Sequence, residues 1–209
     1  MVDGAPPMKR RGWLVAAVLL GCSNRGTPEI AGGLTGALLP VALPRPRFVL
    51  TTTAGDVFDF QARTRGRLTL LFYGYSHCPD VCPATMANLG AIVGRLSSAE
   101  RGLVDVVFVT TDPARDTPAV LGPWLANFEP NIIGLVGSAE ALTEAQVAAG
   151  IGVAVRDGSG ADYTVSHAAQ VLVYSPDDSS HVAYPFGTRQ AQWAADFPKL
   201  FERWTGATR

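Results

Sequence analysis

The sequence is poor in the residues that stabilise small secreted proteins and structural metal domains. Its 209 residues include three cysteines and three histidines. Three cysteines are too few for a disulfide framework. A structural zinc site usually takes four Cys or His ligands at regular spacings, and the chain has no second cysteine pair to complete one. Each cysteine therefore has to be explained by its own position.

Runs of positive charge are also scarce. The formal net charge is −1, and the dense basic run Lys9-Arg10-Arg11 directly precedes an apolar stretch. Nucleic-acid-binding domains usually carry a basic stripe, so we expect no nucleic-acid partner. Apolar residues make up 47% of the chain, and its length suits one domain with a sizeable core.

The sequence also lacks an apolar run of the about 20 residues that a transmembrane helix needs. The apolar run from Trp13 to Leu20 is short and follows basic residues, as in a signal peptide. It ends in Leu-Leu-Gly-Cys22, which resembles a bacterial lipoprotein processing site. We therefore expect a signal peptide over residues 1–21 and a lipid anchor on Cys22.

This leader predicts a protein anchored in the bacterial cell membrane with its domain on the extracytoplasmic side. An ordinary secretory leader with an incidental cysteine is the alternative. The export route, Sec or twin-arginine, and the start codon, Met1 or Met8, stay open at this stage. Residues 22–45 are rich in Gly, Pro and Ala and are expected to form a flexible tether. Residues 46–209 then form the folded domain.

Strand and helix patterns alternate along this domain, which predicts an α/β fold. Residues 68–75 form an almost continuous apolar run, typical of a strand buried on both faces. Residues 48–52 and 57–60 flank a turn and predict a hairpin. A helix is expected from about residue 83, and Pro123 and Pro198 are expected to interrupt two later helices.

Cys78 and Cys82 lie between the buried strand and this first helix. A helix N-terminus favours negative charge, so we expect the pKa of these thiols to be lowered. Residues four apart on a helix have Cβ atoms about 5–6 Å apart. The two sulfurs can therefore bind one soft metal ion or form a disulfide, and the spacing leaves both open.

Three segments together resemble the Sco/SenC copper chaperones: LLFYGYSHCPDVCP, VFVTTDPARDTP, and a histidine at the end of Tyr-Thr-Val-Ser-His167. The resemblance covers residues 46–204. It implies a thioredoxin-like fold with an added N-terminal β-hairpin. It also implies that Cys78, Cys82 and His167 bind copper, as Cu(I) or Cu(II).

The same resemblance implies a role in assembling the dinuclear copper A site of cytochrome c oxidase. The expected partners are subunit II of that oxidase or another copper oxidase, a copper donor protein, and the membrane through the lipid anchor. A metallochaperone is a binding protein, so no catalytic residue is expected.

The alternative function is a thiol–disulfide oxidoreductase that keeps target cysteines reduced. Thioredoxin-like catalysts use Cys-x-x-Cys, whereas the spacing here is one residue longer. His167 distinguishes the two functions, because a reductase does not need it.

Asp112 ends the second apolar strand and should lie near the copper loop. We expect it to support the ligands or to act as a weak ligand. A turn-forming role before Pro113 is the alternative. Arg115 and Asp116 are expected to fix their own loop, Thr-Asp-Pro-x-Arg-Asp, and the helix cap that follows it. His77 and His181 are expected to lie on the surface.

Overall fold

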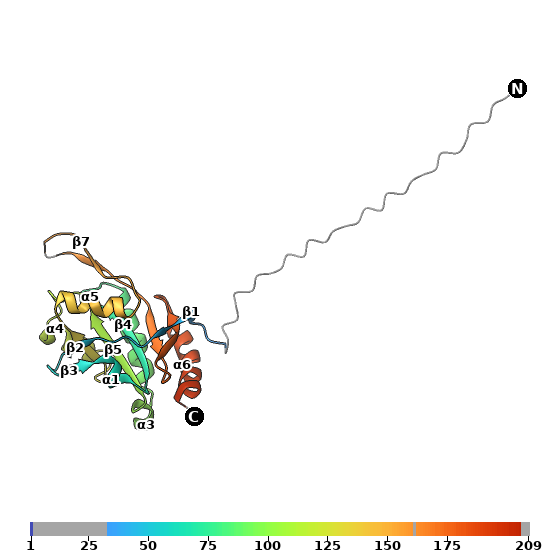
Figure 1. The fold of residues 1–209 in the computed structure, drawn as a ribbon, viewed down its shortest axis with the longest axis horizontal. Coiled ribbons are helices and arrows are strands. Elements are labelled where there is room, and N and C mark those ends of the chain that lie inside the picture. The colour runs from blue at the N-terminus through green and yellow to red at the C-terminus, as the bar shows by residue number, and fades with distance from the viewer. Residues whose placement is uncertain (2–32, 161, 206–209) are drawn as a thin grey trace.

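The computed structural model describes residue 1 and residues 33–160 and 162–205 of the chain. Its main sheet is mixed, with the strands in the spatial order β1 (Ala37–Pro44), β10 (Ser179–Tyr184), β9 (Val171–Tyr174), β4 (Leu68–Gly74), β5 (Val104–Thr110), β6 (Ile133–Val136), β2 (Val49–Thr52) and β3 (Val57–Asp59). A separate two-stranded sheet pairs β7 (Val155–Asp157) with β8 (Thr164–Ser166). The helices are α1 (Phe60–Thr64), α2 (Val81–Val93), α3 (Ser98–Arg101), α4 (Pro118–Ala126), α5 (Ala139–Ala148) and α6 (Gln190–Thr205). Figure 1 shows the helices arranged around the central strands.

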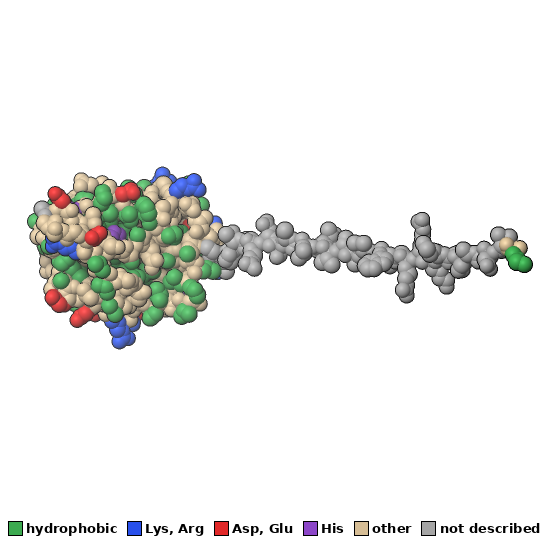
Figure 2. All heavy atoms as spheres, turned by 90° about the horizontal axis from the view of Figure 1, so that it is seen from above, with side chains coloured by type: hydrophobic (Ala, Val, Ile, Leu, Met, Phe, Trp, Pro, Cys, Tyr) green, Lys and Arg blue, Asp and Glu red, His purple; other side chains and the backbone are tan. Residues whose placement is uncertain are grey.

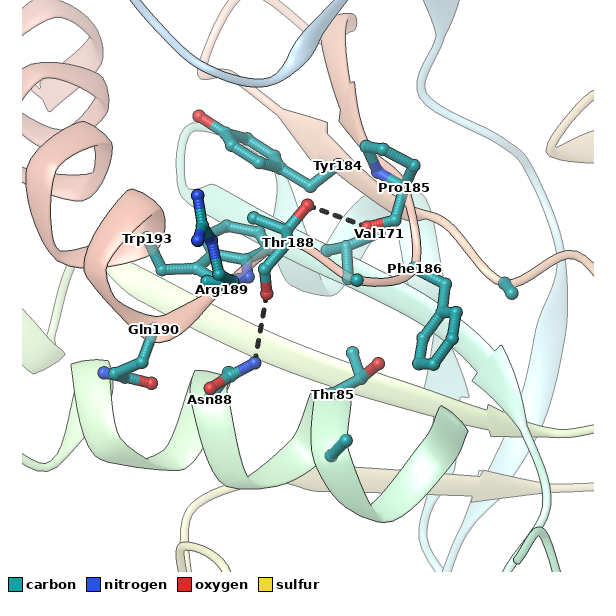
Figure 3. Close-up of a pocket in the computed structure, with 13 residues that line it drawn as sticks. Thr85, Asn88, Val171, Tyr184, Pro185, Phe186, Thr188, Arg189, Gln190 and Trp193 are labelled. Carbon is teal, nitrogen blue, oxygen red and sulfur yellow. Dashed lines mark hydrogen bonds between the residues drawn. The ribbon is translucent and has the colours of Figure 1, made fainter. Parts of the chain in front are cut away.

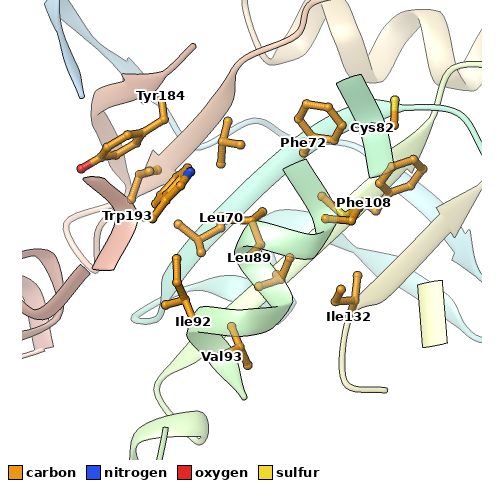
Figure 4. Packing of buried hydrophobic residues seen from close by; sticks show 14 of the residues in the cluster. Leu70, Phe72, Cys82, Leu89, Ile92, Val93, Phe108, Ile132, Tyr184 and Trp193 are labelled. Carbon is orange, nitrogen blue, oxygen red and sulfur yellow. The ribbon is translucent and has the colours of Figure 1, made fainter. Parts of the chain in front are cut away.

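Strand β4 is the centre of the fold, and all seven of its residues are buried. It runs parallel to β5 and antiparallel to β9. Because side chains alternate along a strand, Leu70 and Phe72 join one apolar cluster with α2 and α6, shown in Figure 4. Leu71 and Tyr73 join a second cluster on the opposite face, with α5. The predicted buried strand is thus confirmed.

The predicted hairpin is present as β2 and β3, which pair in antiparallel register. The expected tether over residues 22–45 is wrong for residues 37–44, which form β1 and pair with β10. Pro40 and Pro44 made this segment look unlike a strand. A proline is tolerated in an edge strand, because its nitrogen, which has no N–H to donate, can lie on the side without a neighbouring strand.

Helix α6 also differs from expectation, because it runs as one helix through Pro198 rather than as two pieces. A proline inside a helix costs about 3 kcal/mol. Against this, α6 buries Trp193, Phe197, Leu200 and Phe201 almost completely on one face, at about 1.5–3 kcal/mol each. Packing therefore outweighs the local break. Helix α4 likewise continues through Pro123.

The start of the described domain is held against α6. The buried carboxylate of Asp196 accepts hydrogen bonds from the Thr35 amide, the Thr35 hydroxyl and the Tyr184 hydroxyl, at 2.5, 2.8 and 2.9 Å. The expected leader and Cys22 lie outside the described residues. Within the described part, no helix combines the length and apolar character needed to cross a bilayer.

Charged side chains stand singly among apolar and uncharged ones on the face in Figure 2. Arg45 is one of the charged groups of the interior and is 3% exposed. It donates hydrogen bonds to the hydroxyls of Thr64 and Thr69, the carbonyl of Ser175 and the carboxylate of Asp178, at 2.8–3.0 Å. These partners lie in α1, in β4 and around the β9–β10 turn, so one side chain links three parts of the fold.

Replacing Arg45 with Leu should therefore destabilise the domain. The change leaves buried acceptors without donors, which we expect to lower the free energy of unfolding by about 3 kcal/mol. Urea unfolding followed by circular dichroism measures this. Arg47→Leu, at an exposed position two residues on, is the matched control and should change stability by less than about 0.5 kcal/mol. Equal effects of the two substitutions would contradict the role of the Arg45 hydrogen bonds.

Candidate metal centre

The two cysteines are brought together where β4 ends and α2 begins. Cys78 lies in the connecting loop, and Cys82 lies in the first turn of α2. The Cys82 amide donates to the Cys78 sulfur at 3.4 Å. Both cysteines are buried and free rather than disulfide-bonded. The two sulfurs therefore face the same small space.

His167 reaches the same space from the other side. It follows β8 directly, and its Nε2 lies 3.5 Å from the Cys82 sulfur. Its Nδ1 lies 3.2 Å from the carbonyl oxygen of Ala168. Because a carbonyl only accepts hydrogen bonds, Nδ1 carries the proton and Nε2 turns its lone pair towards the sulfurs. The ring is edge-on to Phe72 and Tyr75, with centroids 5.9 and 5.7 Å away.

The donor atoms of Cys78, Cys82 and His167 all lie within 4.8 Å of one another. Metal–sulfur and metal–nitrogen bonds of about 2.0–2.3 Å place the donors of one ion roughly 3.5–4.5 Å apart. The three side chains therefore fit a single ion with little movement. Two sulfurs and one imidazole form a soft donor set, which suits copper.

The site is part of the apolar core. Figure 4 shows Cys82 at one end of the cluster, beside Phe72 and Phe108. Gly74 leaves the space for this sulfur, because a Cβ atom built on Gly74 would lie 2.6 Å from it. The identity of the residue at the end of β4 thus controls where the Cys82 sulfur can lie.

Burial also decides the charge of the metal-free site. It raises the pKa of the Cys82 thiol well above its ordinary value, although the backbone N–H of Tyr75 opposes the shift. The lowered thiol pKa expected from the helix N-terminus is therefore wrong for Cys82, since desolvation outweighs the helix dipole. Burial lowers the pKa of His167 in the same way. At neutral pH an incoming metal ion meets a neutral imidazole and must displace the Cys82 proton.

Asp116 fixes the start of the cysteine loop. Its carboxylate is 1% exposed. It accepts hydrogen bonds from the Ser76 amide at 3.0 Å, from the Ser76 hydroxyl at 2.5 Å and from the Thr110 hydroxyl at 2.7 Å. The exposed His77 ring lies 3.0 Å from the same Ser76 hydroxyl. His181 is a half-buried residue whose ring pairs with Asp177.

Asp112 is buried behind the site rather than among its donors. One carboxylate oxygen accepts from the Tyr163 hydroxyl at 2.6 Å, and the other is bonded to Arg115. Its role towards a metal ion stays a prediction. Gly74 and Tyr163 are two neighbours of the site that sequence reasoning gave no role. Both belong to the segments that carry the family resemblance, which is the one signal that marked them.

A pocket of about 340 Å³ opens beside the site, between α2 and the loop that precedes α6 (Figure 3). Asn88 crosses its floor and donates to the Thr188 carbonyl at 3.2 Å. None of the three metal-ligand candidates lines this pocket. Thr85 and Ala169 do, and they follow Cys82 and His167 by three and two residues. The pocket is therefore a neighbour of the site and not part of it.

Comparison with known proteins agrees with this geometry. The family model described as SCO1/SenC matches residues 40–202. A putative copper-binding protein of Stutzerimonas stutzeri is 32% identical over 181 residues, which cover 84% of this chain and 88% of the relative. The mitochondrial SCO2 homologue of Bos taurus is 38% identical, over 68% of this chain. The match spans 54% of the bovine protein's length.

Solved structures give the same result. Apo Sco1 of Thermus thermophilus is 29% identical, with a TM-score of 0.70 over 80% of this chain and 96% of that one. ScoI of Bradyrhizobium japonicum, solved with copper bound, is 27% identical, with a TM-score of 0.67 over 78% of this chain and 99% of that one. The expected thioredoxin-like fold is thus confirmed.

The space left by Gly74 gives a direct test of the site. Gly74→Ala should push the Cys82 sulfur away from Cys78 and His167. We expect Cu(I) binding to weaken by about 10- to 100-fold, the equivalent of the about 1–3 kcal/mol that overpacking costs. Competition with a chromophoric Cu(I) chelator measures this.

The control is Gly152→Ala, because a Cβ atom there meets nothing within 4 Å. It should leave Cu(I) affinity unchanged. Unaltered binding by the Gly74→Ala protein would mean that the position of the Cys82 sulfur does not depend on this glycine.

Proposed function

The chain belongs to the SCO1/SenC family, and we propose that it is a copper-binding metallochaperone that helps assemble the dinuclear copper A site of cytochrome c oxidase. The observation that carries the proposal is the convergence of two thiols and one imidazole within 4.8 Å. A related structure of this fold is described as a member of the Sco family of cytochrome c oxidase assembly proteins. The Stutzerimonas relative is named as copper-binding, and the Bradyrhizobium relative was solved with copper.

The donor set supports copper in two oxidation states. Two thiolates satisfy Cu(I), which accepts low coordination numbers and soft ligands. Cu(II) prefers a harder nitrogen donor as well, and His167 supplies one from Nε2. Burial of Cys82 would keep water away from an ion held there. Such a site suits a protein that receives copper from a donor protein and passes it to subunit II or another copper oxidase.

The alternative function, a thiol–disulfide oxidoreductase, is not favoured. A reductase needs the two thiols but has no use for an imidazole 3.5 Å from one of them. This observation favours metal binding as the main task.

The protein acts at the membrane in this proposal. Residues 1–21 serve as a lipoprotein signal peptide, and Cys22 becomes the lipidated N-terminus. The domain then lies on the extracytoplasmic side of the bacterial membrane. The sequence Leu-Leu-Gly-Cys22 and its preceding basic and apolar segments support this location.

The first test separates the roles of the thiols and the imidazole. Cys82→Ala should weaken Cu(I) binding by roughly a thousandfold or more, because one thiolate cannot chelate. His167→Ala should keep Cu(I) binding within about tenfold but lose stable Cu(II). Without the imidazole, two Cu(II) ions oxidise the two thiolates to a disulfide and become Cu(I). Anaerobic titrations that follow the sulfur-to-copper absorption band and the free thiols measure both effects.

His181→Ala is the matched control for the histidine, because its ring lies on the surface beside Asp177. It should bind Cu(I) and Cu(II) as the wild type does. If the His167→Ala protein holds Cu(II) like the wild type, then His167 is not a ligand and the reductase function regains support.

The second test concerns the anchor. The intact mass of the membrane-extracted protein should show acyl groups on an N-terminal Cys22, and Cys22→Ser should release the domain from the membrane fraction. Copper binding by the released domain should be unchanged. A mature wild-type protein that starts elsewhere and is recovered without detergent would rule out the lipid anchor.

A further inference from the structure

The hairpin β7–β8 carries the histidine side of the site. Its two strands form a sheet of their own, separate from the main sheet. Figure 1 shows the segment at β7 projecting from the body of the domain. All three residues of β7 are exposed, and His167 comes directly after β8. The position of His167 therefore depends on the contacts that join this hairpin to the domain.

Tyr163 makes the first of these contacts. Its ring lies between two guanidinium groups, with Arg115 3.6 Å and Arg156 3.7 Å from the ring centroid. Its hydroxyl donates to Asp112 at 2.6 Å, and its carbonyl accepts from Arg115 Nη1 at 3.1 Å. Cation–π contacts of this kind are strongest where the groups are shielded from water.

Arg115 is one group that links this hairpin to the domain. It belongs to the loop between β5 and α4, where it is also paired with Asp112. It contacts the ring face, the backbone carbonyl and, through Asp112, the hydroxyl of Tyr163. Arg156 differs, because it belongs to β7 itself and moves with the hairpin.

The same guanidinium also faces the cysteine side of the site. Arg115 lies 5.6 Å from the ring centroid of Tyr75. The Tyr75 hydroxyl accepts from the Val165 amide in β8 at 3.3 Å, and its ring packs edge-on against His167. Arg115 thus lies between Tyr163, which supports the histidine side, and Tyr75, which leads into the cysteine loop.

We propose that Arg115 is a positioning residue that holds His167 beside the two cysteines by fixing Tyr163, at the turn end of hairpin β7–β8, to the domain. When this contact opens, the three-ligand site becomes a two-thiolate site. Arg115 therefore determines how well the site retains Cu(II) relative to Cu(I). The proposal rests on the proposed copper function.

The experiment compares Arg115→Met with Arg156→Met. Each substitution removes one guanidinium from the same ring, but only the first removes a contact between the hairpin and the rest of the domain. In the metal-free protein, Arg115→Met should speed amide hydrogen exchange over residues 163–167 by about tenfold, the equivalent of one strong buried contact. Arg156→Met should change this exchange by less than about threefold.

Copper supplies the second measurement. Arg115→Met should accelerate the loss of Cu(II), followed by its sulfur-to-copper absorption band, by about tenfold or more, and should alter Cu(I) affinity by less than about threefold. Residues outside the hairpin should keep wild-type exchange. A merely structural role would weaken the binding of Cu(I) and Cu(II) together. A loss of Cu(II) binding alone therefore identifies a positioning role.

Tyr163→Leu is the second variant, because it removes the same contact but leaves the Arg115–Asp112 pair intact. It tests the proposal even if the Arg115→Met protein does not fold. It should reproduce the selective loss of Cu(II). Wild-type retention of Cu(II) by both variants, or equal damage from Arg156→Met, would overturn the proposal. If the wild type binds no copper, the proposed function fails, while hydrogen exchange in the metal-free protein still decides whether Arg115 holds the hairpin.

Discussion

The properties of the site depend on the burial of one sulfur atom. The Cys82 side chain is fully buried at the end of β4, in the space that Gly74 leaves open. Removal of water from this position raises the pKa of the Cys82 thiol, which favours its protonated form in the metal-free site. It also ties metal binding to the core, because Phe72 and Phe108, which surround the sulfur, are packed by α2 and the central strands. The packing that stabilises the fold therefore also determines the geometry of the site.

Much of the central fold could be predicted from the sequence because its signals are local. A continuous apolar run marks β4, and a turn between two short segments marks the hairpin of β2 and β3. The cysteine pair could be placed at the start of α2 for the same reason. His167 could not be placed from residue patterns, since it meets Cys82 across 85 positions of sequence. There the family resemblance supplied what local physics does not.

The errors share one cause, because each was a local rule outweighed by tertiary packing. Prolines suggested a tether where β1 pairs with the edge of the sheet, and a break where α6 continues through Pro198. The helix N-terminus suggested an acidic thiol at Cys82, where desolvation makes it a weaker acid. In all three cases the deciding quantity was the surface buried or the partner gained, and neither can be read from neighbouring residues.

The short loop between β5 and α4 contacts both halves of the site. Asp116 holds Ser76 on the cysteine side, and Arg115 holds Tyr163 on the histidine side, one residue apart in sequence. A displacement of this loop would thus change the distance between the sulfur donors and the nitrogen donor. A protein that docks on the loop could open or close the copper site without touching any ligand.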